Sequence, residues 1–519
     1  MRLYLRCSLS ARAMLSFAVV SVASISMAAH YYVSPSGDDG NAGTSVSAAF
    51  KTIQAGADAA LSPGDTVTVM AGTYKERVLV KGEGTKDNPI VFLADGDAIL
   101  DGTGLDNMGF VPDEWNGVHS GGGENGNDWV TIDGFTFKDF QYTSGNDNDM
   151  VTINPSDGWV VQGCTFIRVH LAINIRGHNA KILDCDFDSL YSHACVACNS
   201  NNIVVKDVTI RNGNLLQEVV SFSAVNKFLL TDTVLVENIV SEGHYGPGWW
   251  FDSENYHFVF RNNVIRNCRG RIGQPDWEGP GMWIETNKNS NSQIYNNLIE
   301  NCTGAGICIM ESQDLDIHNN VVRDCGSAVE LRHWGVDTTY DRGPITNVNF
   351  HDNFFDGWVS AGVATSIGEW GTLVLDSGTF EWSPEANNLV FDNNYYCQPG
   401  GKPLFSFIGQ QYQTLADVRS GLGFEANGEI NCDPGDIITT SSYHVAAHRQ
   451  MSDTPTFLKV VGNRLPVDVR GMTAGASVHV YDLQGKRIGA TRADDRRAIG
   501  PGAQRVAKGM YIVKEFAGE

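Results

Sequence analysis

Short apolar–polar alternations recur between polar turns from about residue 130 to about residue 400. Each unit starts with one or two turn-forming residues and continues into a β-rich pair, as in Asn262–Ile265, Asn296–Ile299 and Asn319–Val322. Less regular copies begin at Gly163, Asp184, Asp207, Asp352 and Asn393. The units are spaced by roughly 21 to 34 residues, a period typical of solenoids, and no helical periodicity separates them.

This pattern predicts an all-β fold, a right-handed parallel β-helix whose coils each carry three short strands. Neighbouring coils would be hydrogen-bonded about 4.8 Å apart, with apolar side chains stacked inside. Asn at a fixed turn position predicts a ladder of stacked side-chain amides. Outward side chains on one strand would form exposed ladders, where function is expected.

The composition narrows the classes of partner. The chain has 56 Gly and 16 Pro, which suits many turns between short strands, and its formal net charge is −23. Nucleic acids and anionic membranes need a positive surface, so neither is expected as a partner. The same charge argues, more weakly, against a polyanionic substrate.

The first 28 residues have the pattern of a secretory signal peptide. Basic residues at Arg2, Arg6 and Arg12 precede an uncharged apolar run, Ala13–Ile25, and Ser26-Met27-Ala28 gives a cleavage site after Ala28. The run is short for a membrane span, and no later stretch is long enough to be one. We therefore expect a bacterial protein that is secreted or held at the cell surface.

Residues 31–102 resemble the opening of pectate-lyase-like β-helix proteins. The resemblance rests on Tyr32–Asp39, Phe50–Gln54, Pro63–Val67, Ala71–Tyr74 and Leu100–Gly102. It implies a β-helix over residues 29–445. The family includes polysaccharide lyases, glycoside hydrolases and members without known activity. A short helical stretch, Lys51–Ala60, would cover the open end of the first coil.

The C-terminal residues have a different pattern. A linker is expected at 446–456, followed by a small β-sandwich at 457–519 with strands at Ser477–Tyr481 and Met510–Lys514. The Tyr481-Asp482-x-x-Gly485-Lys486 turn and the later Gly509-x-Tyr511-x-Val513 resemble the sorting domains of some secreted bacterial proteins. That resemblance implies a contact with a secretion machinery; an accessory domain without a sorting role is the alternative.

The cysteines are too dispersed for a small disulfide scaffold. Cys268, Cys302 and Cys325 each follow Asn or Asp at one repeat position, which favours stacked interior residues over disulfides. Cys195 and Cys198 form an isolated C-x-x-C, a weak indication of zinc or redox chemistry.

Residues 244–334 hold the candidate chemistry. Counting from downstream polar residues places three carboxylates, Asp252, Glu285 and Glu311, near one lateral position on successive coils. Stacked carboxylates repel each other, so stability alone would disfavour them. Residues expected to bind the substrate on the same surface are Arg176, His244, Tyr245, Trp249, Trp250, Trp283, Arg332, His333 and Trp334.

Carboxylates on adjacent coils would lie about 5 Å apart, the separation in retaining glycosidases. We expect Glu285 to be the nucleophile and Glu311 the acid/base, with Asp252 orienting or replacing one of them. The Gly-x-x-x-carboxylate coils also resemble β-helix hydrolases of the β-xylosidase kind, which favour Asp on the earlier coil. This chain has Glu285 there, and Glu311 falls one residue out of register.

Three functions stay open at this point: a glycoside hydrolase, a calcium-dependent polysaccharide lyase, and a non-catalytic surface protein that binds glycans. A lyase would need a basic residue and a cation to neutralise a uronate. The hydrolase needs no cofactor, whereas a calcium ion could bind between the carboxylates. The expected partner is an extracellular glycan, and the protein is expected to be a monomer. The tryptophans and the lone histidines could have structural roles instead of binding the substrate.

Overall fold

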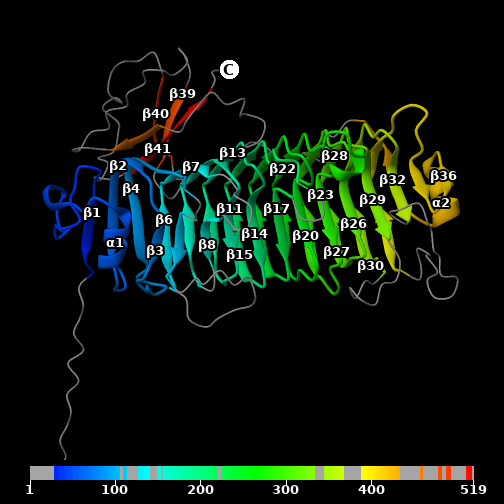
Figure 1. The fold of residues 1–519 in the computed structure, drawn as a ribbon. Helices are drawn as coiled ribbons and strands as arrows, with labels where there is room; N and C mark the ends of the chain where they lie inside the picture. The colour runs from blue at the N-terminus through cyan, green and yellow to red at the C-terminus, as the bar shows by residue number, and fades with distance from the viewer. Residues whose placement is uncertain are drawn as a thin grey trace, which may run out of the picture. The chain divides into compact units, whose positions relative to one another are not determined.

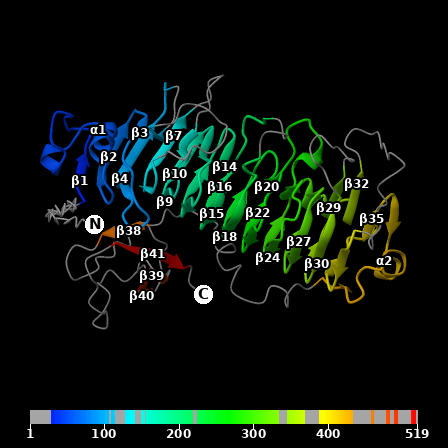
Figure 2. The same ribbon diagram turned by 90° about the horizontal axis from the view of Figure 1, so that it is seen from below.

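The computed structural model describes residues 28–105, 109–113, 127–140, 149–153, 156–218, 224–333, 344–367 and 387–432, and four strands between residues 456 and 516. The contacts divide the chain into two units, residues 1–443 and 444–519. The first unit is a parallel β-helix in which successive coils lie side by side in chain order (Figures 1 and 2). The predicted all-β solenoid is therefore confirmed.

Each regular coil contributes two strands to a 24-stranded sheet, here sheet A, and one to a 13-stranded sheet, sheet B. The first strand row of sheet A is β1 His30–Val33, β2 Thr66–Tyr74, β4 Ile90–Asp101, β6 Val130–Asp133, β9 Val160–Gln162, β12 Lys181–Leu183, β15 Asn201–Lys206, β18 Asp232–Glu237, β21 Val259–Arg261, β24 Ser292–Tyr295, β27 Gln313–His318, β30 Thr346–His351 and β33 Leu389–Asp392.

A two-residue corner separates this row from the second strand row of sheet A. That row is β7 Thr136–Phe140, β10 Thr165–Val169, β13 Asp186–Asp188, β16 Thr209–Arg211, β19 Val240–Glu242, β22 Val264–Arg266, β25 Leu298–Glu300, β28 Val321–Arg323, β31 Phe354–Asp356, β34 Tyr395–Cys397 and β37 Glu429–Ile430.

Sheet B carries the candidate site, and all its pairings are parallel except the last. Its strands are β3 Val78–Val80, β5 Phe110–Pro112, β8 Asp149–Ile153, β11 Leu171–Ile175, β14 His193–Cys198, β17 Asn226–Leu229, β20 Trp249–Asp252, β23 Met282–Glu285, β26 Ala305–Met310, β29 Ser327–His333, β32 Ala361–Ile367, β35 Phe405–Phe407 and β36 Gln410–Tyr412.

The corner within sheet A explains the repeated Asn and Asp residues. The first corner residue, such as Asn262 (φ 58°) or Asn296 (φ 55°), has the left-handed backbone that Asn and Asp tolerate. The second residue points inward and is buried. Its amide joins the next coil, as when Asn297 Nδ2 donates to Asn320 Oδ1 at 2.9 Å. The predicted ladder is confirmed and runs through Asn263, Asn297, Asn320, Asn353 and Asn394.

The two ends of the solenoid are covered. Helix α1, Ile53–Ala59, follows the 3-10 helix η1, Val46–Ala48, and covers the first coil as predicted. The Glu76 carboxylate accepts the free N–H groups of Ile53 and Gln54, both at 2.9 Å. These are among the orphan donors that every helix start must satisfy.

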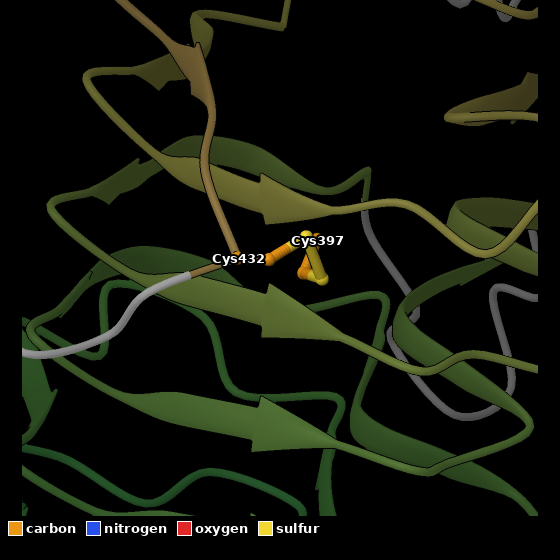
Figure 3. Close-up of a disulfide and its surroundings, with 2 residues drawn as sticks. All are labelled: Cys397 and Cys432. Atoms are coloured by element: carbon orange, nitrogen blue, oxygen red, sulfur yellow. A yellow bond between two sulfur atoms is a disulfide. The ribbon is translucent and has the colours of Figure 1, made fainter.

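Helix α2, Leu415–Leu422, lies at the other end. The buried Glu425 carboxylate accepts hydrogen bonds from Asn394 Nδ2 at 2.8 Å and from the Tyr396 hydroxyl at 2.7 Å, so it terminates the asparagine ladder. A disulfide joins Cys397 at the end of β34 to Cys432, 35 residues later (Figure 3). Both contacts fasten this segment to the last coil.

The second unit contains one antiparallel sheet in the order β38–β41–β39–β40. Its strands are β38 Thr456–Lys459, β39 Ser477–Tyr481, β40 Arg487–Arg492 and β41 Met510–Phe516. The two expected strands are present, and the second layer of a sandwich stays a prediction. The proposed signal peptide, residues 1–28, falls almost wholly outside the described residues.

Candidate functional site

The outer surface of sheet B carries two parallel rows of side chains. In β20, Trp249 and Phe251 point into the core, so Trp250 and Asp252 point outward. The tryptophan row consists, in register, of Lys227, Trp250, Trp283, Cys308 and Glu330. The carboxylate row consists of Leu229, Asp252, Glu285, Met310 and Arg332.

Two of the three predicted carboxylates share the carboxylate row. Asp252 and Glu285 are register partners on the adjacent strands β20 and β23. Strands in a sheet are about 4.8 Å apart, so equivalent outward side chains start at that spacing. Like charges in this position destabilise the sheet unless other charges compensate.

The expected position of Glu311 is wrong by one residue, because Met310 is the register partner of Glu285. The buried Ser312 hydroxyl accepts the Asn287 N–H at 3.1 Å and fixes this alignment. Glu311 instead occupies the turn after β26, with φ 48° and no exposed surface. It therefore does not extend the carboxylate row.

Asp252 is held through both of its carboxylate oxygens. Lys227 Nζ lies 2.8 Å from Oδ2, and the Ser253 hydroxyl donates to Oδ1 at 2.8 Å. The Lys227 ammonium also lies 3.7 Å from the centre of the Trp250 ring. A cation thus lies between an aromatic face and a carboxylate, both of which favour its charge.

The outward tryptophans are packed rather than open. Trp250 and Trp283 stack with ring centres 4.9 Å apart, and each is only 3% exposed. With Trp277, Ala224 and Met310 they form a small apolar cluster outside the sheet. The expectation that they present free faces to a sugar is not met here, because protein side chains cover them.

Arg332 closes the other end of the cluster. It makes two hydrogen bonds of 2.9 Å to the Glu330 carboxylate, and its guanidinium lies 5.0 Å from the Trp277 ring and 5.2 Å from the Trp283 ring. Lys227 and Arg332 therefore lie on either side of the Asp252–Glu285 pair. Lys227 binds Asp252, a member of the pair, whereas Arg332 binds Glu330.

Two long turns lie beside the rows. Residues 267–281 contain the 3-10 helix η2, Asp276–Glu278, which Arg271 holds through paired contacts to Glu278 at 2.8 and 2.7 Å. Gln217, in the turn between β16 and β17 two coils earlier, accepts the Ile272 N–H at 2.8 Å and links the two turns. Glu218 is anchored by His170 and Ser192, and the hydrogen bond from His170 contributes most to lowering the pKa of that carboxyl to about 2.

The glycines of the Gly-x-x-x-carboxylate motif have a structural role. A Cβ on Gly281 would lie 2.4 Å from Ile299 Cγ2, and Gly248 is similarly close to Ile265. Cys302 Sγ also approaches Gly281, and Cys268, Cys302 and Cys325 are buried free thiols, as predicted. The motif therefore reflects a narrow corner of the interior.

Several other predicted site residues lie elsewhere. Trp249 belongs to the core, so its expected place in a substrate site is wrong. His244 is fully buried and hydrogen-bonded to Ser241 at 2.9 Å, and burial lowers its pKa to about 3, which supports a structural role. The Tyr245 ring lies 4.4 Å from the Arg269 guanidinium.

Three further predictions concern the ends of the rows. Arg176 directly follows β11, three coils before Asp252 on the same surface. The His333 side chain and Trp334 lie outside the described residues. Sequence reasoning missed Lys227 and Glu330, which become visible only when outward positions two residues before the carboxylate row are also followed.

In the described part of the chain, no three His, Cys, Asp or Glu side chains are grouped so that they could hold a metal ion. No helix there is long and apolar enough to cross a membrane. The calcium site stays a prediction. Cys195 is an inward residue of β14 and Cys198 an outward one; both are free, so the C-x-x-C neither pairs nor forms part of a metal cluster.

Comparisons with known proteins support the fold. No curated protein matches the chain. Among solved structures, the complex of XylC with xylose is similar at 14% identity over 93% of this chain and 100% of that chain, with a TM-score of 0.52. A GH136 lacto-N-biosidase from Eubacterium ramulus has 12% identity over 77% and 67%, at a TM-score of 0.45. A mannuronic-acid-specific polysaccharide family 6 lyase from human gut microbiota has 17% identity over 78% and 91%, at a TM-score of 0.44.

Residues 149–289 and 276–396 match the family model described as a right-handed beta helix region. These residues include every strand of the two outer rows. This part of the chain is therefore a right-handed parallel β-helix, and the fold that the opening motifs implied is confirmed.

Proposed function

We propose that the protein is a retaining glycoside hydrolase that acts on an extracellular glycan, with Asp252 and Glu285 as its carboxylate pair. The observation that carries the proposal is their register pairing on the outer surface of β20 and β23. Adjacent strands lie about 4.8 Å apart, and the two carboxyl groups of retaining glycosidases are about 5–5.5 Å apart. Inverting enzymes need about 6.5–9.5 Å, which suits residues on adjacent strands less well.

The surroundings of the two carboxylates favour different roles for them. Asp252 receives an ammonium on one oxygen and a hydroxyl on the other, so both of its oxygens are held as acceptors, which suits a nucleophile. Glu285 would then be the acid/base. It would protonate the leaving glycosidic oxygen while Asp252 attacks the anomeric carbon, and would later take a proton from the water that hydrolyses the glycosyl ester.

This assignment revises the prediction made from the sequence. Glu285 was expected as nucleophile with Glu311 as acid/base, but Met310 occupies the position next to Glu285. Asp252, the expected substitute, takes the vacant role. The order Asp then Glu along the chain also agrees with the β-xylosidase resemblance. The structurally similar XylC binds xylose, which is consistent with a small neutral sugar as substrate here.

The proposal includes export before action on the glycan. It rests on the signal-peptide pattern of residues 1–28 and, more indirectly, on the Cys397–Cys432 disulfide, because disulfides persist mainly in oxidising compartments. Recovery of mature protein starting near residue 29 from the periplasm or medium would test this part separately.

The reaction is tested with the mature protein on aryl glycosides and on neutral and acidic oligosaccharides. Reducing ends should form without absorbance near 235 nm, with or without chelator, and the first product should keep its anomeric configuration. Absorbance near 235 nm would identify a lyase instead. Formation of an inverted sugar would contradict the retaining pair.

The two roles are separated by azide rescue. On an activated aryl glycoside, Glu285→Ala should form a glycosyl azide of retained configuration, whereas Asp252→Ala should form the inverted one. The matched control is Asp232→Asn, an outward carboxylate of sheet A that pairs with His257 at 2.7 Å. It should keep normal turnover, and rescue with the opposite configurations would exchange the two assignments.

A further inference from the structure

Lys227 occupies a nearly buried position, where its charge destabilises the fold unless partners compensate it. It lies in β17 between the inward-facing Asn226 and Phe228, and its side chain is only 9% exposed. A buried ammonium loses hydration and needs compensating partners. Two partners are present: the Asp252 carboxylate at 2.8 Å and the Trp250 ring at 3.7 Å.

The contact between Lys227 and Asp252 runs diagonally across the surface. The register partner of Lys227 is Trp250, in the tryptophan row, whereas Asp252 lies one coil on and in the other row. The ammonium lies over the Trp250 ring and reaches the carboxylate from there. The ammonium is therefore aimed at one member of the carboxylate pair by packing on an aromatic face.

The other member of the pair lies on the far side of Asp252. The titratable groups on the strands next to β20 are Lys227 on β17 and Glu285 on β23, and Ser253 supplies a neutral donor from the following turn. The Arg332 guanidinium is bound to Glu330 within its own strand by two hydrogen bonds. The Lys227 ammonium thus contacts Asp252, the member of the pair on the strand next to its own.

We propose that Lys227 is a positioning residue that keeps Asp252 ionised and oriented, so that the shared proton stays on Glu285. For its kinetic consequences, this inference rests on the proposed glycosidase reaction. Two carboxylates that face each other cannot both ionise without cost, and a neighbouring cation decides which one does. Lys227 therefore assigns the two roles, although it does not touch the reacting atoms.

Lys227→Met keeps the apolar stem and removes the charge. We expect kcat/KM at the optimum to fall by about 10²-fold and the acid limb of its pH profile to move up by about one to two pH units. The fall should lie mainly in kcat. Lys227→Arg, which keeps the charge over Trp250, should retain most of the activity and the original acid limb. If Lys227→Met does not fold, Lys227→Gln is used in its place.

The matched control is Lys206→Met. Lys206 is also an outward lysine that binds a carboxylate one coil on, Glu237 at 3.0 Å, but it lies on sheet A. Its removal should leave kcat, KM and the pH profile unchanged. A similar change in both variants would show a general effect of lost ion pairs and would overturn the proposal.

A second measurement does not depend on turnover. With ¹³C-labelled aspartate carboxyls, the Asp252 resonance is identified by its loss in Asp252→Asn, and its titration is followed in the wild type and in Lys227→Met. A midpoint that moves to higher pH in the variant supports the role of Lys227. An unmoved midpoint overturns it, even if the wild type is active.

The two hypotheses can therefore fail separately. If the wild type hydrolyses no glycoside but the Asp252 titration moves, the proposed function fails and the Lys227 assignment stands. If the wild type is active and neither the acid limb nor the titration moves, the function stands and Lys227 is only structural.

Discussion

Two rows of charged side chains on this β-helix are arranged in opposite ways. On the second strand row of sheet A, the signs alternate from coil to coil through Arg211, Glu242, Arg266, Glu300, Arg323 and Asp356. Arg266 lies 2.6 Å from Glu242, and Arg323 lies 2.5 Å from Glu300. On sheet B, the carboxylate row places Asp252 directly next to Glu285.

The difference separates stability from chemistry. Alternating signs give each charge two opposite neighbours, which is the favourable arrangement for a ladder in register. The carboxylate row forgoes this, and the cation that binds Asp252, Lys227, comes from the tryptophan row. Such an arrangement makes sense if the two carboxylates are needed together.

The largest expected effect is the loss of turnover in Glu285→Gln compared with Glu300→Gln. The first removes the proposed acid/base, and turnover on substrates with poor leaving groups should fall by about 10³-fold or more. The second removes a carboxylate from the alternating row and should leave kcat/KM within about twofold. Equal activity of the two variants in initial-rate assays would remove the functional distinction between the rows.

Glu425 provides a third carboxylate, one that accepts hydrogen bonds from the neutral side chains of Asn394 and Tyr396. Burial is the largest cause that raises its pKa, to about 7, and the hydrogen bonds from Tyr396 and Asn394 oppose that shift. A carboxyl whose pKa is raised in the folded state stabilises the fold at low pH and loses that effect as pH rises. We expect the free energy of unfolding to fall by about 3 kcal/mol between pH 4.5 and pH 8 through this group.

Glu425→Gln tests this expectation, because the amide resembles the protonated acid. The variant should lose most of the pH dependence that arises from the cap, measured by urea unfolding at pH 5 and pH 8. If the wild type is not less stable at pH 8 than the variant, the carboxylate is tolerated in its ionised form by the surrounding amides.

Much of the fold could be predicted because its repeat is local. A residue with left-handed backbone followed by an inward residue, as in Asn262-Asn263, marks each sheet A corner, and the helix over the first coil follows from a short apolar pattern. The site was predicted only in part. Asp252 and Glu285 follow from spacing. The turn between Asp252 and Asn255 is one residue longer than that between Glu285 and Asn287, and Glu311 is itself the single turn residue between Met310 and Ser312.

When a turn is one residue longer or shorter, each residue counted back from its end moves between an inward, an outward and a turn position. Counting back from Ser312 therefore placed Glu311 in the carboxylate row instead of in the turn. Lys227 was missed for another reason: its importance arises from a diagonal contact between two rows, which no linear spacing reveals. The covering of Trp250 and Trp283 likewise depends on Lys227, Arg332 and Trp277, which come from other strands and a turn.

A smaller effect is expected when the alternating row is made to resemble the carboxylate row. Arg266→Glu would place three carboxylates on successive coils, at 242, 266 and 300, and should lower the free energy of unfolding by about 1–2 kcal/mol. Arg266→Gln removes the pairs without adding repulsion and should cost less, about 0.5 kcal/mol. Urea unfolding of both variants separates the two contributions; equal costs would show that repulsion in this row is screened.

The smallest effect should be a gain in stability when the like charges of the carboxylate row are reduced. At a pH high enough to ionise Glu285 as well as Asp252, Glu285→Gln keeps the shape of the side chain and removes one of the two adjacent charges, so the free energy of unfolding should rise by about 0.5 kcal/mol at low salt. Added salt screens exposed charges, so the gain should shrink as ionic strength increases. Glu300→Gln should change in the other direction, because it removes attractions to Arg266 and Arg323 rather than a repulsion. Both substitutions are measured by unfolding at low and high salt. Opposite signs would show that the protein gives up stability at Asp252 and Glu285, and equal signs would show that Lys227 already offsets the repulsion.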